Sequence, residues 1–494
     1  MRREDIIAIY ELGPEAVCEL IEQLVSTHEA QIGRLSEQLV ALQGRVKELE
    51  ARLAQNSGNS SKPPSSDRAR KLRRRPKSDK PSGGQKGHPG HHLSVNETPD
   101  EVYCLEPRAC LYCGESLINA PSAGEERRQV FELPPVRLKV TEYRAQTKQC
   151  PRCGQPSSAE FPAQVSNVVQ YGPRLCGVVN YLLNYQLVPL ERTGELIEDL
   201  FGHRLSVGTV CNMRQRCAEG LVEFDSNLKE TLIKAPVVDF DETGFYVNAK
   251  RYWVHSASTP ELAYYAWHGR RGRQAMAEIG ILPQFKGVAV HDAYSSYFGY
   301  ECEHSLCNAH HLRELSAVYE EDVETQGWAL EMRSLLSRIK QAVDEVKGVG
   351  KDSLDPNQLS LFEARFDELL TEGERANPPP EKPHLKPKRG RVKKTKAQNL
   401  LGRLRKYRTE TLRFMHDLSV PFDNNLAERD IRMLKVQQKI SGCFRSEQGA
   451  SAFCRIRSYI ATVRKQGFDV LDALEGVFRG HPLTLTPQVV QLAA

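Results

Sequence analysis

The sequence contains no apolar stretch that approaches the length of a membrane span. A bilayer-spanning helix needs roughly 20 consecutive apolar residues, and no run in the 494 residues is of that length. The N-terminus, which begins MRRED, also lacks the apolar core of a signal peptide. We therefore expect a cytoplasmic protein with no membrane partner.

The chain also lacks a strong excess of charge of either sign. Its formal net charge is +5, so an affinity for nucleic acid has to come from local clusters of basic residues. Apolar residues make up 40% and charged residues 27% of the chain, which is typical of a globular protein with enough material for a core. The length allows roughly three domains of ordinary size.

Secretory features are absent as well, so we expect the thirteen cysteines to be reduced thiols. Two pairs have the C-x-x-C spacing of metal-binding knuckles: Cys110 with Cys113, and Cys150 with Cys153. Four thiolates suit a structural zinc ion and leave no open coordination position. A redox pair is the alternative, although two knuckles rarely occur together for that purpose.

The segment between the two knuckles alternates like a strand over residues 128–147 and is expected to form a hairpin. This gives a zinc-ribbon-like module over residues 99–165. Other nearby groups could replace a cysteine ligand, namely Cys104, His88, His91 and His92.

Residues 1–55 are predicted to be helical, because apolar residues recur there at alternating gaps of three and four. The seam contains Ile32, Leu35, Leu39, Leu42, Val46, Leu49 and Leu53. This spacing predicts a coiled coil and therefore a homo-oligomer that assembles through the N-terminus. A single helix lying on a globular body is the alternative. The less regular residues 6–24 could form a short separate helix.

Residues 56–98 have the composition of a disordered linker. Residues 62–92 contain ten Lys or Arg and two Asp, with almost no large apolar side chain, so this segment cannot fold alone. Its run of Arg73, Arg74 and Arg75 suits contacts with DNA phosphates. A solvated linker without a partner is the alternative.

Residues 166–234 are predicted to form a helical DNA-binding domain with a helix-turn-helix. A helix over residues 191–201 and a turn over 202–205 precede Ser206, a favourable N-cap for a second helix. The second helix carries side chains able to reach phosphates or base edges: Thr209, Asn212, Arg214, Gln215 and Arg216. An ordinary helical hairpin is the alternative.

Residues 235–480 are predicted to form an α/β domain. The expected order is three antiparallel strands, a short helix and a fourth strand, over residues 237–247, 252–256, 262–267, 273–282 and 288–291. This order is typical of a ribonuclease-H-like fold, in which the first and fourth strands lie side by side. Asp241 on the first strand and Asp292 after the fourth would then meet.

A large helical insertion over about residues 300–420 is expected to interrupt this domain, because the stretch between Asp292 and Glu428 is too long for a plain loop. One amphipathic face is marked by Met332, Leu335, Ile339, Val343 and Val346. Residues 378–396 form a basic segment that suits DNA backbone contacts or a flexible loop. The helical pattern resumes at Asn424, and residues 481–494 are expected to be a loose tail.

Three carboxylates on two strands and a helix can share divalent cations. Mg²⁺ prefers oxygen ligands, and two such ions about 4 Å apart can activate an attacking hydroxyl and stabilise the leaving oxygen of a phosphodiester. We expect Asp241 and Asp292 to bridge two Mg²⁺ ions, which Mn²⁺ could replace, and Glu428 to hold one of them. Arg432 and Lys435 share a helix face with Glu428 and could bind DNA phosphates.

Each of these assignments has an alternative. Asp239 lies on the same strand face as Asp241 and could be a metal ligand itself or a carboxylate with no role. Glu428 could close the N-terminus of its helix in a capping arrangement that begins at Asn425, while Asp430 points elsewhere. A second zinc site is conceivable for His291, Cys302, His304, Cys307, His310 and His311, although their spacing fits no common pattern.

Four motifs stand out in the predicted catalytic region: Asp241-Glu242-Thr243, Asp292 to Tyr297, Cys307 to His310, and Asn424 to Arg429. Together they resemble transposases of the insertion-sequence 66 type, a family of bacterial transposable elements. The leucine-rich N-terminal helix and the cysteine knuckles match as well, so the resemblance extends to about Arg464. By position, it implies that Asp241, Asp292 and Glu428 are the catalytic acids, and Asp239 is not.

The resemblance further implies a ribonuclease-H-like DDE transposase that acts on terminal inverted repeats and on double-stranded target DNA. Such a protein would be associated with a bacterial nucleoid, and small accessory proteins of the same element could assist it. Two features depart from the family: Asn308 replaces the usual large aromatic residue, and residues 56–92 are longer and more basic than expected. Neither feature involves the predicted acids.

Three functional hypotheses follow. The first is a Mg²⁺-dependent transposase in which water and then the freed 3′ hydroxyl of the donor end are the successive nucleophiles. The second is a DNA-binding protein or repressor of transposon origin without catalysis. The third is a structure-specific nuclease on the same fold, which would cut DNA without joining it. The intact set of three acids favours the first.

Overall fold

The computed structural model describes residues 3–56, 58–60, 93–379 and 394–485. These residues form two compact units, of which the smaller contains residues 93–144 and Glu195–Arg204, and the larger contains the rest. The arginine run at 73–75, the histidines near the knuckles and most of the basic segment 378–396 lie outside the described residues.

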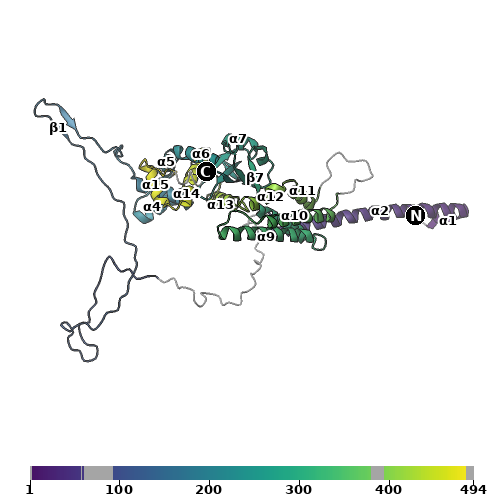
Figure 1. Cartoon of the computed structure of the whole chain (residues 1–494), viewed down its shortest axis with the longest axis horizontal. Helices are drawn as coiled ribbons and strands as arrows, with labels where there is room; N and C mark the ends of the chain where they lie inside the picture. Colours follow the sequence, from purple (N-terminus) through teal and green to yellow (C-terminus); the bar gives the residue numbers. More distant parts are fainter. Residues whose placement is uncertain (1–2, 57, 61–92, 380–393, 486–494) are drawn as a thin grey trace. The chain divides into compact units, whose positions relative to one another are not determined.

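Two helices form the N-terminal segment, as the sequence predicts. Helix α1 (Arg3–Glu11) ends before Gly13, whose φ of +101° breaks the helix, and Pro14 begins α2 (Pro14–Leu53). The short separate helix is therefore shorter than the predicted 6–24. Helix α2 is one long helix (Figure 1). Its apolar seam is exposed along its length, with Ile32 65% and Leu39 57% exposed.

The predicted hairpin between the knuckles is wrong. The described residues 117–146 contain no strand, and the two short strands of this region, β1 (Thr147–Gln149) and β2 (Pro156–Ser158), pair with each other around the second knuckle. Alternation alone does not make a strand, because the backbone groups of a strand also need a partner strand to bond to.

A five-stranded mixed sheet forms the centre of the larger unit. Its strands are β3 (Val237–Val247), β4 (Lys250–Ser258), β5 (Ala263–His268), β6 (Val288–His291) and β7 (Glu303–Leu306). The order across the sheet is β5-β4-β3-β6-β7, with antiparallel pairing from β3 to β5 and parallel pairing from β3 to β7. The predicted pairing of the first and fourth strands is thereby confirmed.

The fifth strand was not predicted from the sequence. The short, polar strand β7 lies within the range that the sequence analysis gave to the insertion, so the insertion begins later, with α8 (Asn308–Glu321). A strand of four residues, three of them polar, carries too little apolar pattern to be recognised, and here the pairing with β6 defines it.

Helices cover both faces of the sheet. Helix α14 (Glu447–Lys465) is buried along most of its length and packs on β5, and α6 (Val222–Lys234), α7 (Arg273–Ile279) and α15 (Val470–Phe478) contribute to the same core. Helix α13 (Asn425–Ser441) packs on β3 and β4 through Ile431 and Leu434. This packing brings the first turn of α13 to β3.

The insertion has its own apolar core. Helices α8, α9 (Gly327–Gly348), α10 (Pro356–Ala376), α11 (Lys396–Lys406) and α12 (Arg408–His416) pack around it. The predicted face on α9 is buried in this core, with Val346 partly covered. The helical nature of the insertion is confirmed.

The helical region before the sheet contains α3 (Pro173–Asn180), a π-helical turn over Tyr181–Tyr185, α4 (Leu190–Phe201) and α5 (Val207–Glu219). The backbone N–H of Thr209 donates to Ser206 Oγ at 3.1 Å, so the predicted N-cap forms.

The C-terminal segment begins with residues that pack on the core. The Leu483 N–H donates to Tyr459 Oη at 2.9 Å, so residues 481–485 are not the loose tail expected from the sequence, and residues 486–494 lie outside the described residues. In the parts of the chain that the structure describes, no helix combines the length and apolar character needed to cross a bilayer.

Candidate active site

The parallel pairing of β3 and β6 brings two of the predicted acids to the same end of the sheet. Asp239 is in register with Val290, so Asp241 and Asp292 occupy equivalent positions two residues further along. The Glu242 N–H donates to Asp241 Oδ1 at 2.8 Å, and the Tyr294 N–H donates to Asp292 Oδ1 at 2.9 Å.

Glu428 approaches these carboxylates from the first turn of α13. Burial raises the pKa of Asp241 well above its usual value, and the negative charges of Glu242, Asp292 and Glu428 raise it further. The third predicted acid therefore lies within electrostatic reach of the first. The structure brings all three acids together from three elements that are distant in sequence.

The carboxylate of Glu428 is not used to close its helix. The N-cap of α13 is Asn424, and no side chain caps this helix terminus by a hydrogen bond. Asn424 instead donates from its Nδ2 to the Phe240 carbonyl at 2.7 Å, which fixes the start of α13 to β3. The capping interpretation of Glu428 is therefore wrong.

Glu428 has only distant partners. His310 Nε2 lies 3.7 Å and an Arg313 guanidinium nitrogen 3.6 Å from Glu428 Oε1, and this buried oxygen accepts no hydrogen bond from the described residues. A carboxylate oxygen that is buried without a donor is costly unless a ligand satisfies it.

Asp239 has different surroundings, although it shares a strand face with Asp241. It is 4% exposed, and burial raises its pKa to about 8, against the opposing charge of Lys465. Lys465 Nζ lies 2.7 Å from Asp430 Oδ2, which also accepts a hydrogen bond from Ser258 at 2.9 Å. Lys465 and Ser258 thus satisfy Asp430, which points away from Glu428 as expected, whereas Asp239 Oδ1 is buried without a hydrogen-bond partner among the described residues. Asp239 and Asp430 therefore share one nearby cation, Lys465.

A fourth carboxylate beside the acids is neutralised by its neighbours. Glu242 accepts a hydrogen bond from the Tyr297 hydroxyl, and its Oε1 lies 2.6 Å from Arg271. The Arg271 guanidinium also stacks on the Tyr294 ring at 4.2 Å. Sequence reasoning did not assign roles to these residues, although Glu242, Tyr294 and Tyr297 occur in the motifs that carry the family resemblance.

Basic and aromatic side chains continue from the acids along β3 and β4. Lys435 Nζ donates to the backbone oxygen of Gly244, three residues beyond Asp241. Arg251 and Arg271 lie over the Trp253 ring, at 4.6 and 5.1 Å from its centroid. We call Arg251, Arg271 and Lys435 the basic strip. Arg432 is exposed on α13.

The cysteines and histidines after Asp292 do not form one cluster. His291 Nε2 lies 3.0 Å from His304 Nδ1, and Cys302 Sγ lies 4.0 Å from the other nitrogen of His304. His311 bonds to Asn308, whose amide donates to the Thr411 carbonyl at 3.0 Å. The polar residue at position 308 thus fixes α8 to α12.

The remaining two, Cys307 and His310, lie with Glu428. Among the described residues, these three form the group in which thiol, imidazole and carboxylate ligand atoms all come within 4.8 Å of one another.

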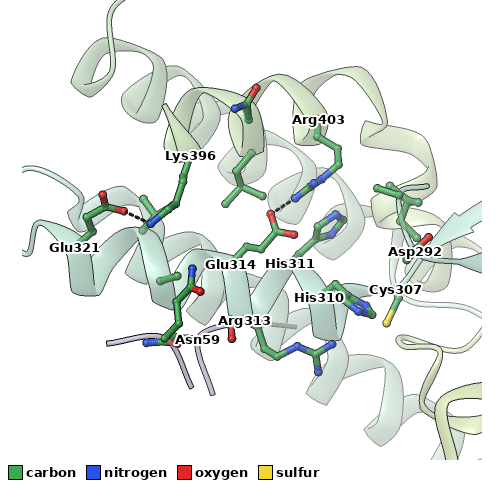
Figure 2. A pocket seen from close by; sticks show the side chains of 18 of the residues that line it. Asn59, Asp292, Cys307, His310, His311, Arg313, Glu314, Glu321, Lys396 and Arg403 are labelled. Carbon is green, nitrogen blue, oxygen red and sulfur yellow. Dashed lines mark hydrogen bonds and ion pairs between the residues drawn. The ribbon is translucent and has the colours of Figure 1, made fainter. Parts of the chain in front are cut away.

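A cavity of about 640 Å³ opens beside the acids. Figure 2 shows Asp292, Cys307 and His310 at one end of it, with the His310 ring and the Cys307 side chain turned toward each other. The ion pairs of Glu314 with Arg403 and of Glu321 with Lys396 form the wall on the side of the insertion.

The comparisons with known proteins agree with this geometry. The sequence profile of the transposase IS66 family matches residues 168–452, which is more than half of the chain. The chain belongs to this family. The matched region begins before α3 and ends within α14, so it includes the sheet, the insertion and all three acids. The resemblance inferred from the motifs is confirmed, and this IS66 transposase is a DNA-processing enzyme by family.

Two shorter regions match other profiles. Residues 107–154 of the IS66 transposase match the zinc-finger binding domain of transposase IS66, and residues 11–94 match a family of unknown function. A comparison with curated proteins gave no match. The zinc-finger match supports a structural zinc.

The two knuckles have the same local backbone geometry. Gly114 and Gly154 have φ angles of +75° and +73°, and their N–H groups donate to the carbonyls of Cys110 and Cys150 at 2.9 and 2.8 Å. Hydrogen bonds from the N–H groups of Cys113 and Tyr112 lower the pKa of Cys110, and those of Cys153 and Arg152 lower that of Cys150. This favours the thiolate form that ligates zinc.

The two arginines predicted to contact DNA on α5 lie differently. Arg214 is half-buried beside Gly449 of α14, and burial lowers its pKa. Arg216 is exposed and lies over the Phe478 ring at 5.7 Å. Arg216 is thus the better placed of the two to meet a phosphate.

Proposed function

We propose that this chain is a DNA transposase that cleaves transposon ends and joins them to target DNA, with Asp241, Asp292 and Glu428 as its catalytic acids. The observation that carries the proposal is the convergence of these three carboxylates without a compensating cation in hydrogen-bonding contact. The strand order and directions of the sheet support a ribonuclease-H-like fold for the catalytic domain.

The acids suit a pair of divalent cations. Asp241 lies within β3 and Asp292 directly follows the adjacent parallel strand β6. Glu428 offers a buried oxygen that no donor in the described chain satisfies. Mutual repulsion of buried carboxylates is relieved by a metal ion, and an all-oxygen donor set suits Mg²⁺ or Mn²⁺. Bound there, such ions would activate the attacking hydroxyl and stabilise the leaving oxygen.

The residues around the acids organise the site. Arg271 and Tyr297 satisfy both carboxylate oxygens of Glu242, so Glu242 is not available as a metal ligand. Asn424 anchors the start of α13 to β3 and so sets the distance between Glu428 and Asp241.

The basic strip is proposed to bind the scissile DNA strand. Stacking on Trp253 restricts the guanidinium plane of Arg251 but leaves its N–H edges for phosphate oxygens. Arg271 also stacks there and uses its Nε and Nη2 for Glu242, so its Nη1 is the group proposed to meet a phosphate. Lys435 and the exposed Arg432 extend the positive charge along α13. Arg216 and the arginines at 73–75 are further proposed DNA contacts.

The remaining parts are proposed to assemble the complex. The exposed seam of α2 would form a coiled coil in a homo-oligomer, which could hold two transposon ends together. Cys110, Cys113, Cys150 and Cys153 would share the structural zinc. Terminal inverted repeats would be the recognised DNA, small proteins of the same element would be possible partners, and the working place would be the bacterial nucleoid.

The test is the joining of a labelled, pre-cut transposon end to plasmid DNA in Mg²⁺. We expect joining by the wild-type protein and loss of joining in Asp241→Ala, Asp292→Ala and Glu428→Ala, with end binding kept. Asp239→Asn is the matched control, because it changes a buried carboxyl on the same strand face. Tight end binding by a wild-type protein that neither cuts nor joins, even with Mn²⁺, would contradict the proposal and favour a binding protein without catalysis.

A further inference from the structure

Glu428 faces a second group of ligand atoms that the proposed Mg²⁺ chemistry does not use. Cys307 is the N-cap residue of α8, and His310 lies one turn further along, so both side chains meet at the start of this helix. Glu428 reaches them from α13. One sulfur, one imidazole nitrogen and one carboxylate oxygen thus come within 4.8 Å of one another.

The protein leaves these atoms largely unsatisfied. Cys307 Sγ accepts one hydrogen bond, from the Asn424 N–H at 3.2 Å. His310 Nδ1 and Glu428 Oε1 are buried and have no hydrogen-bond partner among the described residues. Two buried polar atoms without partners in one small cluster indicate that a ligand completes it.

The three donors select a particular class of metal. Sulfur, nitrogen and oxygen together suit Zn²⁺, which commonly takes three protein ligands and keeps a fourth position for water. Mg²⁺ avoids thiolate and imidazole ligands. Cys307 and His310 also line the cavity of about 640 Å³, so a water molecule or a DNA oxygen has room to occupy the fourth position.

The geometry points to a second metal site at Cys307, His310 and Glu428, selective for Zn²⁺ and distinct from the structural zinc of the knuckles. Because Glu428 belongs to both sites, Zn²⁺ bound here withdraws this carboxylate from Asp241 and Asp292. The site is thus an inhibitory one that blocks Mg²⁺-dependent joining. The binding part stands on the geometry alone, and the inhibitory part rests on the proposed function.

Metal binding is tested first and without reference to activity. The full-length protein is titrated with Co²⁺, which reports thiolate ligation by its absorption, and with Zn²⁺ by calorimetry. The wild-type protein should bind one more equivalent of Co²⁺ or Zn²⁺ than His310→Gln or Cys307→Ser. Asp292→Asn is the matched control and should keep that equivalent, because Asp292 is an acid of the neighbouring site only.

Two results would overturn the site. One is a stoichiometry that is equal in the wild type and in His310→Gln. The other is loss of the extra equivalent in Asp292→Asn. Thermal unfolding of each variant distinguishes the loss of a ligand from the loss of the fold. If Cys307→Ser unfolds, the metal stoichiometry of His310→Gln decides the test.

Inhibition is tested in the joining reaction at fixed Mg²⁺, with each protein normalised to its own rate without Zn²⁺. Losing one ligand should raise the half-inhibitory Zn²⁺ concentration at least about 10-fold in His310→Gln, since even an outer partner of a metal ligand changes affinity by about 10–100-fold. Equal sensitivity of both proteins would overturn the inhibitory role. A wild type that never joins DNA would instead count against the proposed function, while the titration still decides the site.

Discussion

Two groups of buried carboxylates lie on neighbouring parts of β3, and they differ in how the protein treats their charge. Asp239 lies near Lys465, which pairs with the neighbouring Asp430, so one cation opposes the negative charge of this group, and the Ser258 hydroxyl donates to Asp430. Asp241 lies with Asp292 and Glu428, and its nearest charges are negative. Both groups are costly to bury.

This difference indicates which of the two carboxylate groups is the candidate ligand site. Folding alone favours the compensated arrangement, because a buried charge without a partner destabilises the native state. The uncompensated group therefore needs another reason to persist, and we propose that a divalent cation supplies it. Glu242 is the intermediate case, since it lies beside the acids yet is satisfied by Arg271 and Tyr297.

The largest effect is expected from neutralising one member of the uncompensated group. Asp241→Asn should lower the joining rate by at least about 10³-fold, because loss of a single catalytic group commonly costs about 10⁴-fold or more. The same change removes repulsion and should raise the melting temperature without metal by about 2–4 °C. Joining assays and thermal unfolding measure the two effects.

Asp239→Asn is the control for this change, and it should keep most of the joining activity. Equal loss of joining in the two variants would contradict the distinction drawn between them. A melting temperature that falls in Asp241→Asn would show that this carboxylate is stabilised in the native state after all.

The next largest effect is expected on stability, when the cation of the Asp239 and Asp430 group is removed. Lys465→Met removes the cation that pairs with Asp430 at 2.7 Å and that also donates to the Thr259 and Leu262 carbonyls. Removing one partner of a buried pair costs about 3–5 kcal/mol, so the free energy of unfolding in denaturant should fall by that amount. Joining per folded molecule should change little.

A second substitution tests the cause. Asp430→Asn in the Lys465→Met background removes the stranded charge and should restore part of the lost stability. No recovery in the double variant would place the effect in the two backbone contacts instead of the ion pair.

A smaller loss of joining is expected when Arg271, the cation that pairs with Glu242, is replaced. Arg271→Met leaves the buried Glu242 carboxylate without its cation beside Asp292, and we expect joining to fall about 10–100-fold, the range for residues that support a metal site from outside its ligands. The double variant Arg271→Met with Glu242→Gln removes the stranded charge. Recovery of stability without recovery of joining would assign Arg271 a direct DNA contact, whereas recovery of both would limit it to neutralising Glu242.

Much of the catalytic core could be predicted from the sequence. The limits of β3 and β6 match the expected ranges. Strand β3 begins with an apolar run that reaches Asp241 and continues to Val247, and β6 is an apolar run that Asp292 follows. The convergence of Asp241, Asp292 and Glu428 followed from strand order and from family motifs. The distinction between Asp239 and Asp241 came only from the resemblance, since both side chains point to one face of the strand.

The rest depended on contacts between distant parts of the chain. Compensation of Glu242 needs Arg271 from the loop before α7 and Tyr297 from the loop after β6, and no local pattern links them. The pairing of Cys307 and His310 with Glu428 likewise needs α8 and α13 to meet. Strand β7 and the failed hairpin at 128–147 show the same limit, because pairing decides whether a short polar segment becomes a strand.

The smallest effect concerns how pH and metal act on the two groups. Burial raises the pKa of Asp239 to about 8 and that of Asp241 well above its usual value of 3.8. A carboxyl whose folded-state pKa is raised contributes stability that is present at low pH and lost as pH rises through that pKa. Without metal, the melting temperature should therefore fall as pH rises from about 4 to about 8, and each Asp→Asn variant should flatten part of that slope.

Mg²⁺ separates the two contributions. A ligand at ten times its dissociation constant stabilises the native state by about 1.4 kcal/mol, which corresponds to a rise of about 3–5 °C for a domain of this size. At pH 8 we expect this rise in the wild type and in Asp239→Asn but not in Asp241→Asn, because only the second variant loses a metal ligand. An equal rise in all three proteins would place the bound Mg²⁺ away from Asp241, and a loss in Asp239→Asn would make Asp239 the ligand that the family resemblance excludes.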